Sequence, residues 1–478
     1  MANLARGWAI IKAGFYELCP LGSDNQRIHD GTERNYVPKL ANRIVIALLT
    51  AALVMCAGVV SVSAFGFLSP AGGSLDPAAY VLPLPQAQGP ADGLAGPDTD
   101  SRPDSVRIQQ GISALDRSQL GTVSYTVQDI AGNQVAGEDA DTARIPASSW
   151  KILTSLGVLA AYGPNHRFST TVVSSDGGIV LVGGGDPFLT SGTGFDPGQA
   201  TIEDLADKTS QALSGQGVSA VVLGYDDTLF AGVQWSGAWT PAYSADVAPI
   251  SALSVDPDGD ADSNTSLQAA RTFRNLLVDR GISVTDIRAQ QATPDAQILA
   301  EVESLPLSQV VHRVLEISDN FGAEVLFRHI SVAAGLDGSF ASAQSAQTNF
   351  LQSKGLWAPA MSVSDGSGLS LADKVTPSVL ASAVRLAYED PALADVLMGL
   401  PVAAVDGTLD YRFAAADTAS ARGVLRAKTG THDYVRSMTG FAQTSSGSIV
   451  FFSFMLNDLT NHTAALRWLD QAGAVLTS

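Results

Sequence analysis

Ser148 and Lys151 form the first pair in the sequence whose types and spacing could do chemistry. Apolar residues recur at helical spacing from Ile152 onward, which predicts a buried helix that begins near Ser148. Positions three apart share one face of a helix, so the hydroxyl would lie beside the amine. A lysine in a poorly hydrated, positively charged place can lose its proton and activate a serine as a nucleophile. The free backbone N–H groups of the helix start could hold a developing oxyanion.

Taken alone, this spacing also describes a capped core helix with an exposed lysine, because Ser-x-x-Lys occurs by chance about once in a chain of this size. Two later motifs favour the catalytic interpretation. Ser318-Asp319-Asn320 interrupts the helical stretch from Leu307 to Ala334 and marks a break between two helices. Lys428-Thr429-Gly430-Thr431 lies at the edge of a predicted strand. The three motifs occur in the order typical of penicillin-binding proteins and class A β-lactamases.

From about residue 105 to its end, the chain resembles the class C penicillin-binding proteins, which are D-alanyl-D-alanine carboxypeptidase/endopeptidases. The 170 positions from Ser148 to Ser318 match the insertion of this family, whereas class A β-lactamases have a much shorter interval. The resemblance also rests on the stretches Pro146-Ala147-Ser148, Gly183-Gly184-Gly185-Asp186-Pro187, Ala252-Leu253-Ser254-Val255-Asp256, Ser318-Asp319-Asn320-Phe321-Gly322-Ala323-Glu324 and Asp365-Gly366-Ser367-Gly368-Leu369-Ser370.

This resemblance implies an α/β (α+β) fold of the penicillin-recognising, serine transpeptidase/β-lactamase-like kind, with an antiparallel sheet flanked by helices and an inserted additional domain. It implies cleavage of the terminal D-Ala-D-Ala bond of peptidoglycan stem peptides, or of peptide cross-links, through a serine acyl-enzyme. β-Lactam antibiotics would acylate the same serine, because they mimic D-Ala-D-Ala and their leaving group stays tethered. No metal and no organic cofactor is expected.

The resemblance also implies how the bond would be attacked. Ser148 would be the nucleophile and Lys151 its general base, with the protonated form of Lys151 disfavoured by the positive charge of nearby Lys428. The backbone N–H groups of Ser148 and Thr431 would form the oxyanion hole.

The remaining motif residues are expected to handle the substrate and its leaving group. Ser318 would relay a proton to the leaving amine, and Asn320 would hydrogen-bond the substrate amide. In the segment Thr429-Gly430-Thr431, the two threonine hydroxyls would bind the terminal carboxylate.

Composition limits the other functions that this chain could have. It has 478 residues, of which 46% are apolar and 16% charged, with a formal net charge of −19. Two or more domains fit within that length. No nucleic acid is expected as a partner, because nucleic-acid binding calls for basic stripes. The only cysteines are Cys19 and Cys56, and the six histidines lack His-x-x-x-His spacing, so no metal site is predicted.

The N-terminal part predicts a membrane anchor. Residues 44–68 form a run of 25 residues without a charge, and about twenty apolar residues span a bilayer. The basic residues Lys39 and Arg43 precede it, which places residues 1–43 as a tail in the cytoplasm and the catalytic part outside the cell membrane. A cleaved signal peptide is the alternative, since Val62-Ser63-Ala64 is similar to a cleavage site. Residues 69–104 are rich in proline and glycine and predict an extended linker.

Three segments are expected in the folded part. Residues 105–170 and 291–478 would form the penicillin-recognising domain, and residues 171–290 the inserted domain or domains. A glycine-rich loop after a strand, such as the one after Val182, is a feature of some nucleotide-binding sites. Here no Gly-Lys-Thr/Ser follows and Pro187 interrupts the helix start, so a tight turn is expected instead.

Two departures from the family and two alternative functions remain open from the sequence. The insertion is short for the family, and His432-Asp433-Tyr434 stands where smaller, less polar residues are expected; His432 is either a surface residue or one that tunes substrate choice. One alternative is a catalytically idle cell-wall-binding protein on the same fold, which the three intact motifs disfavour. The other is a β-lactamase, for which no dedicated base for the deacylating water is evident.

Overall fold

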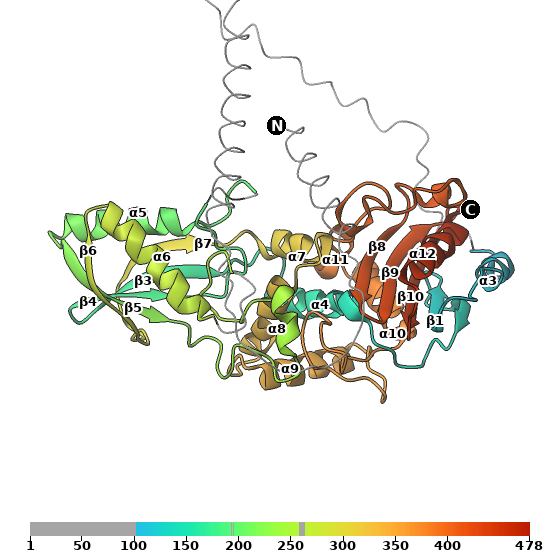
Figure 1. Cartoon of the computed structure of the whole chain (residues 1–478), viewed down its shortest axis with the longest axis horizontal. Coiled ribbons are helices and arrows are strands. Elements are labelled where there is room, and N and C mark those ends of the chain that lie inside the picture. The colour runs from blue at the N-terminus through green and yellow to red at the C-terminus, as the bar shows by residue number, and fades with distance from the viewer. Residues whose placement is uncertain (1–101, 193, 195, 258–262) are drawn as a thin grey trace, which may run out of the picture. The chain divides into compact units, whose positions relative to one another are not determined.

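The computed structural model describes residues 102–478, apart from 193, 195 and 258–262 (Figure 1).

The first sheet carries one of the three motifs on its edge strand. Five strands follow the order β2-β1-β10-β9-β8, and each neighbouring pair is antiparallel. Their bounds are β1 Thr122–Gln128, β2 Gln134–Glu138, β8 Arg426–His432, β9 Val435–Gln443 and β10 Ile449–Asn457. The antiparallel sheet that the resemblance implied is therefore confirmed.

Strand β10 shows why this sheet is covered on both faces. Successive side chains of a strand point to opposite faces of the sheet. Phe452 and Phe454 belong to one apolar core, whereas Phe451 and Met455 belong to another. A central strand that is apolar on both faces requires helices on both sides.

Helices α3 (Ser105–Ser113) and α12 (His462–Thr477) cover one face, and α10 (Pro377–Glu389) covers the other. The two ends of the folded part are joined where the Arg107 guanidinium donates to the carbonyl of Val475 at 2.9 Å, between α3 and α12. The helices flanking the sheet thus come from distant parts of the sequence.

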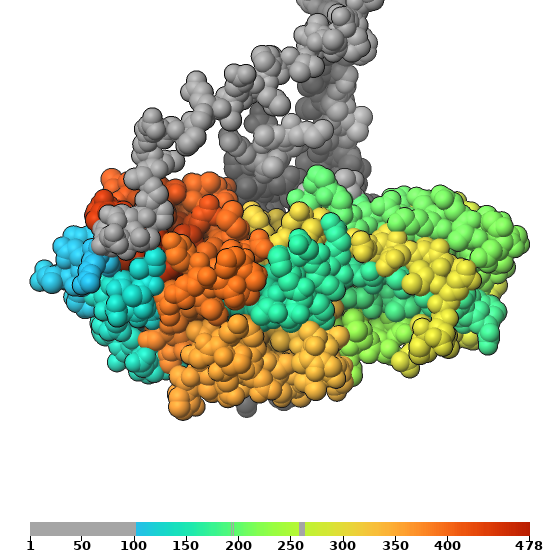
Figure 2. All heavy atoms as spheres, turned by 180° about the vertical axis from the view of Figure 1, so that it is seen from behind, coloured from blue at the N-terminus to red at the C-terminus, as the bar shows by residue number. Residues whose placement is uncertain are grey.

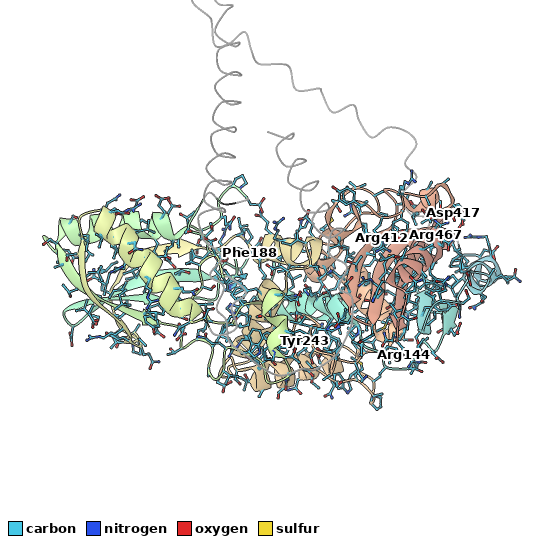
Figure 3. All side chains as sticks on the ribbon, viewed as in Figure 1. Arg144, Phe188, Tyr243, Arg412, Asp417 and Arg467 are labelled. Atoms are coloured by element: carbon cyan, nitrogen blue, oxygen red, sulfur yellow. The ribbon has the colours of Figure 1, made fainter. Side chains whose placement is uncertain are left out.

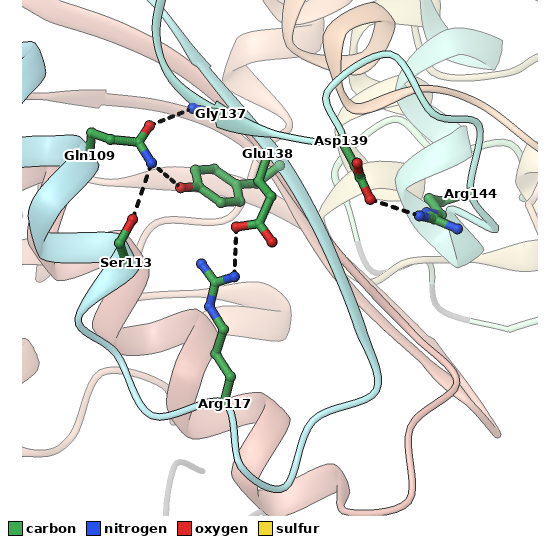
Figure 4. Close-up of polar contacts among 8 residues, drawn as sticks. Gln109, Ser113, Arg117, Gly137, Glu138, Asp139 and Arg144 are labelled. Carbon is green, nitrogen blue, oxygen red and sulfur yellow. Dashed lines mark hydrogen bonds and ion pairs between the residues drawn. The ribbon is translucent and has the colours of Figure 1, made fainter.

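The first helix is tied to the sheet through Gln109 (Figure 4). Its side-chain amide donates to the hydroxyl of Tyr125 at 3.0 Å and accepts from the backbone N–H of Gly137 at 2.9 Å. Beyond the helix, Arg117 pairs with Glu138 at 2.6 Å. An ion pair this exposed contributes little stability. The Gln109 contacts therefore add to the burial of Ile108 and Ile112, which pack α3 against β1 and β2.

A helical layer lies next to the first sheet and carries the first two motifs. Its central helix α4 (Lys151–Tyr162) is buried from Lys151 to Leu159, as expected of a helix that is apolar on all sides. The helices around it are α7 (Leu307–Glu316), α8 (Asn320–Ala333), α9 (Phe340–Ser353) and α11 (Asp395–Met398). Short 3-10 turns lie at η2 Ala147–Trp150, η3 Pro241–Ala245, η4 Pro391–Leu393, η5 Gly407–Leu409 and η6 Ala416–Ala421.

A second sheet of five strands follows the order β6-β5-β4-β3-β7. Its bounds are β3 Ser169–Ser175, β4 Gly178–Val182, β5 Ala220–Asp226, β6 Ser283–Ala289 and β7 Ile298–Glu303. Helices α5 (Ile202–Gly215) and α6 (Thr265–Asp279) pack on it in one apolar core. The green and yellow surface in Figure 2 belongs to this region. The domain boundary expected at residue 290 falls before β7, which pairs with β3 in this sheet.

The predicted membrane span at residues 44–68 and the linker at 69–104 lie outside the described residues, apart from the last three linker positions. Among the residues that are described, no helix is long and apolar enough to cross a bilayer.

Candidate active site

The turn that presents Ser148 is held in a constrained backbone conformation. The sequence predicted a helix starting near Ser148, but a 3-10 turn, η2, occupies Ala147–Trp150 and the α-helix starts at Lys151. Ala147 has φ 48°, a left-handed conformation that costs a non-glycine residue energy and persists only where the surroundings enforce it. The loop at Gly368 packs directly against this turn, because a Cβ there would lie 2.0 Å from the carbonyl oxygen of Ala147.

Lys151 is buried and makes three polar contacts through its amine. It donates to the hydroxyl of Ser148 at 3.0 Å, to the side-chain oxygen of Asn320 at 2.6 Å and to the backbone carbonyl of Ser367 at 2.9 Å. The first two motifs, expected to work together, thus meet at one nitrogen atom.

Burial lowers the pKa of Lys151 to about 8, and the negative charges of Glu324, Asp365 and Asp319 oppose that shift. The sequence-based expectation assigned the shift to the positive charge of Lys428. Desolvation is the main cause instead, because Lys151 is fully buried at the start of α4. The repulsion between the two lysines acts on Lys428, whose pKa is held well below its usual value by burial first and by Lys151 second.

The second motif lies in the tight connection between α7 and α8. Ser318 has φ 61°, and Asp319 caps α8 by accepting from the backbone N–H of Gly322 at 3.2 Å. This cap places Asn320 on the first turn of α8, where its amide nitrogen also donates to the carbonyl of Asp246 at 3.0 Å. Asn320 therefore links the Lys151 amine to the loop after η3.

The third motif is on β8, which runs beside the turn at Ser148. The Lys428 amine is buried and donates to the carbonyl of Thr429 at 2.8 Å, while the Thr429 hydroxyl donates to Thr408 at 2.7 Å. A Cβ on Gly430 would lie 2.6 Å from the carbonyl oxygen of Pro146. Glycine at this position is what lets the strand approach the nucleophile so closely.

Two cavities meet at Ser148, and both are also lined by Thr431 and Arg436. The first, here named the cationic cavity, has a volume of about 320 Å³ and adds Ser318, Thr408, Arg412 and the Thr429–Gly430 edge to its lining. None of its described lining residues is acidic.

The second cavity, here named the histidine cavity, has a volume of about 390 Å³ and is lined by His432 and His462. Asp246 and Asp433 also line it, so its charge differs from that of the cationic cavity. The ring of His432 meets that of Tyr243 edge-on at 5.7 Å, and Tyr243 is labelled in Figure 3. His432 is therefore part of the cavity wall rather than an isolated surface residue.

A layer of buried acids, to which the sequence motifs assign no role, lies behind Lys151. Glu324 accepts from the backbone N–H of Ser367 at 2.7 Å and from that of Gly366 at 3.0 Å. Burial and the charge of Asp365 raise the pKa of Glu324 to about 8. The stretches containing these residues were part of the resemblance, yet nothing in their spacing predicted this contact.

Other cavity residues had no signal in the sequence. Tyr243 and Asp246 come from the segment around η3, and Arg436 comes from β9. Among the described residues, no group of three histidine, cysteine or acidic side chains is placed to hold a metal ion.

A serine, a buried lysine and an asparagine joined at one amine, beside a Lys-Thr-Gly strand on an antiparallel sheet, define a penicillin-recognising serine enzyme. Comparison with known proteins narrows this class. The model of the D-Ala-D-Ala carboxypeptidase 3 (S13) family matches residues 106–261 and 261–478. The chain belongs to this family.

Its relatives and the similar solved structures agree with this assignment. A carboxypeptidase of Mycobacterium tuberculosis is 31% identical over 385 residues, covering 76% of this chain and 82% of the relative. The carboxypeptidase DacB of Mycolicibacterium smegmatis is 29% identical, covering 77% and 82%. The crystal structure of penicillin binding protein 4 from Haemophilus influenzae superposes with a TM-score of 0.66 at 20% identity, covering 76% of this chain and 97% of that one. The last likeness confirms the penicillin-recognising fold.

Proposed function

We propose that this protein is a serine-type D-Ala-D-Ala carboxypeptidase/endopeptidase that cleaves peptidoglycan stem peptides through an acyl-enzyme on Ser148. Membership of the S13 family supports the activity. The observation that carries the mechanism is the 3.0 Å contact between the Lys151 amine and the Ser148 hydroxyl.

The burial of Lys151 brings its neutral form, the form that can act as the base, within reach near neutral pH. Its two other partners, the side-chain oxygen of Asn320 and the carbonyl of Ser367, can only accept hydrogen bonds. The protonated amine donates to these two acceptors and to the Ser148 hydroxyl. Once it loses a proton, its two remaining N–H groups serve the two acceptors and its lone pair is left to accept the proton of the serine hydroxyl. The pKa of Lys151, lowered to about 8 by burial, makes this form accessible near neutral pH.

The reaction then follows from these positions. The Ser148 oxygen attacks the carbonyl carbon of the penultimate D-alanine while Lys151 takes the hydroxyl proton. The backbone N–H groups of Ser148 and Thr431 stabilise the oxyanion. The C–N bond breaks, and the leaving amine receives a proton through Ser318, which lines the cavity beside Ser148. Water then hydrolyses the ester and restores the serine.

Labelling with a fluorescent penicillin tests this proposal, with intact mass followed over time on the wild type and on Ser148→Ala. We expect a long-lived adduct on the wild type alone, together with release of D-alanine from a peptide ending in D-Ala-D-Ala. An adduct that turns over within seconds would indicate a β-lactamase. No adduct on well-folded protein would indicate the idle wall-binding alternative.

We also propose that residues 44–68 anchor the protein in the cell membrane with the catalytic part outside, supported by the uncharged run and the basic residues before it. Alkaline extraction of membranes tests the anchor, with a variant lacking residues 44–68 as the control. Release of the full chain by alkali, or a mature N-terminus shortly after Ala64, would contradict it.

A further inference from the structure

Arg436 is a cation at the active site that forms no ion pair with any of the described residues. It lies on β9 directly opposite Thr431 of β8, and facing residues of an antiparallel pair project from the same side of the sheet. It lines both the cationic and the histidine cavity. Its Nε and Nη1 atoms are buried and have no hydrogen-bond partner. Buried guanidinium nitrogens without an acceptor are costly, so a ligand that supplies one is favoured.

The other cations near Ser148 are already occupied. Arg412 pairs with Asp470 at 2.7 Å, and the Lys428 amine donates to the carbonyl of Thr429. Burial together with the charge of Arg412 lowers the pKa of Arg436. An incoming anion would supply the opposite charge and the acceptors that this residue lacks. Figure 3 labels Arg412 on the side of the molecule that carries the first sheet.

The threonine hydroxyls alone do not complete an anion site. From the family resemblance, the hydroxyls of Thr429 and Thr431 were expected to bind the terminal carboxylate. The hydroxyls of Thr429 and Thr408 lie 2.7 Å apart and share one hydrogen bond, so one of their two protons is already used, whereas a carboxylate needs donors. Thr431 is exposed and available. A guanidinium beside it can supply two parallel N–H donors, the arrangement that binds a carboxylate most strongly.

We propose that Arg436 binds the carboxylate of the residue that leaves, and so selects substrates and β-lactams that carry this charge next to the bond that breaks. This inference rests on the proposed function. It assigns the cationic cavity to the leaving residue and the histidine cavity to the acyl part of the stem peptide, with Ser148 between them.

The test compares acylation by benzylpenicillin with acylation by its uncharged methyl ester, measured as second-order rate constants by intact mass. In Arg436→Gln we expect the rate with benzylpenicillin to fall about 10- to 100-fold, as for loss of a hydrogen bond between charged groups. The rate with the methyl ester should stay within about twofold of the wild type, because the ester offers no charge to bind. Arg436→Lys keeps the positive charge but lacks the two parallel N–H donors of a guanidinium, so it should recover part of the rate with benzylpenicillin.

Arg467→Gln is the matched control, because this exposed arginine on α12 pairs with Asp417 away from the two cavities (Figure 3). An equal loss with both compounds in Arg436→Gln, or no loss with either, would overturn the proposal. The methyl ester also controls for folding, because a misfolded variant reacts with neither compound. If Arg436→Gln misfolds, the ratio of the benzylpenicillin rate to the methyl ester rate in Arg436→Lys decides the outcome. Wild-type protein that neither compound acylates would instead disprove the proposed function.

Discussion

The carboxylate of Glu324 accepts a 2.7 Å hydrogen bond from the backbone N–H of Ser367, and the carbonyl of the same Ser367 accepts from the Lys151 amine at 2.9 Å. A buried acid is therefore connected to the base through a single residue. The loop after residue 364 therefore holds the Lys151 amine in place through the Ser367 carbonyl, and it also lines the histidine cavity through Gly368 and Leu369. The same connection means that the acid and the base influence each other's protonation.

Acylation by penicillin should rise with pH and level off above about pH 8. Below the pKa of Lys151, which burial lowers to about 8, the amine is protonated and cannot take the proton of Ser148. Above it the neutral amine can do so. Second-order acylation constants measured between pH 6 and pH 10 check this expectation. A rate that is constant across pH 8, or that still rises beyond pH 9.5, would contradict Lys151 as the base.

Glu324→Gln should move the midpoint of that profile to lower pH. The negative charge of Glu324 raises the pKa of Lys151, so its removal disfavours the protonated amine. Because the pKa of Glu324 is itself about 8, only part of that charge is present at the midpoint, and the expected shift is about half a pH unit. The glutamine oxygen still accepts from the backbone N–H groups, so the fold should persist. Glu389→Gln, at a surface pair with Arg385, is the control and should leave the midpoint unchanged. A midpoint that stays in place or rises in Glu324→Gln would show that this acid is only structural.

Gly430→Ala should destabilise the protein and slow acylation. The added Cβ would lie 2.1 Å from the Ser437 hydroxyl and 2.6 Å from the carbonyl of Pro146, so β8 must move away from the nucleophile. Overpacking of this kind costs about 1–3 kcal/mol. Urea unfolding and penicillin acylation measure the two effects. Gly215→Ala, where a Cβ meets nothing within 4 Å at the end of α5, should lower neither stability nor acylation, and equal losses in the two variants would refute the argument.

Arg328→Met should lower the free energy of unfolding by at least about 3 kcal/mol, because several buried carbonyls lose their donor. The fully buried guanidinium of Arg328 donates to the carbonyls of Gly338, Ala231 and Ile250 at 2.6, 2.6 and 3.0 Å. Chemical denaturation measures the loss. Arg385→Met removes a surface pair with Glu389 and should cost less than about 0.5 kcal/mol. Similar losses in both variants would show that the buried contacts contribute little.

The motifs predicted the centre of this site because their residues are fixed by local structure. Ser148 and Lys151 meet at the start of α4, and the Asp319 cap sets Asn320 on the first turn of α8. Both arrangements depend on a few neighbouring residues. The antiparallel sheet and its flanking helices followed from the resemblance and are confirmed.

The cavity walls could not be predicted because they depend on contacts between distant segments. Tyr243 reaches His432 only once the loop at η3 is held against α8, and Arg436 is significant because no acceptor lies beside its buried nitrogens. Neither fact is visible in the spacing of residues. The cause of the Lys151 pKa shift was also misjudged, since burial is a property of the packed molecule and the sequence shows only neighbouring charge.

The strand order β2-β1-β10-β9-β8 has a consequence for biosynthesis. The hairpins β1–β2 and β8–β9 join only through β10, which ends at Asn457. During translation the second sheet, complete by residue 303, can form early, but the two hairpins must wait until nearly the whole chain has been made. Long-range pairing of this kind slows folding and leaves apolar strands open to aggregation in the meantime. A premature stop shortly before β10 would therefore release a chain with an intact second sheet and no assembled catalytic centre.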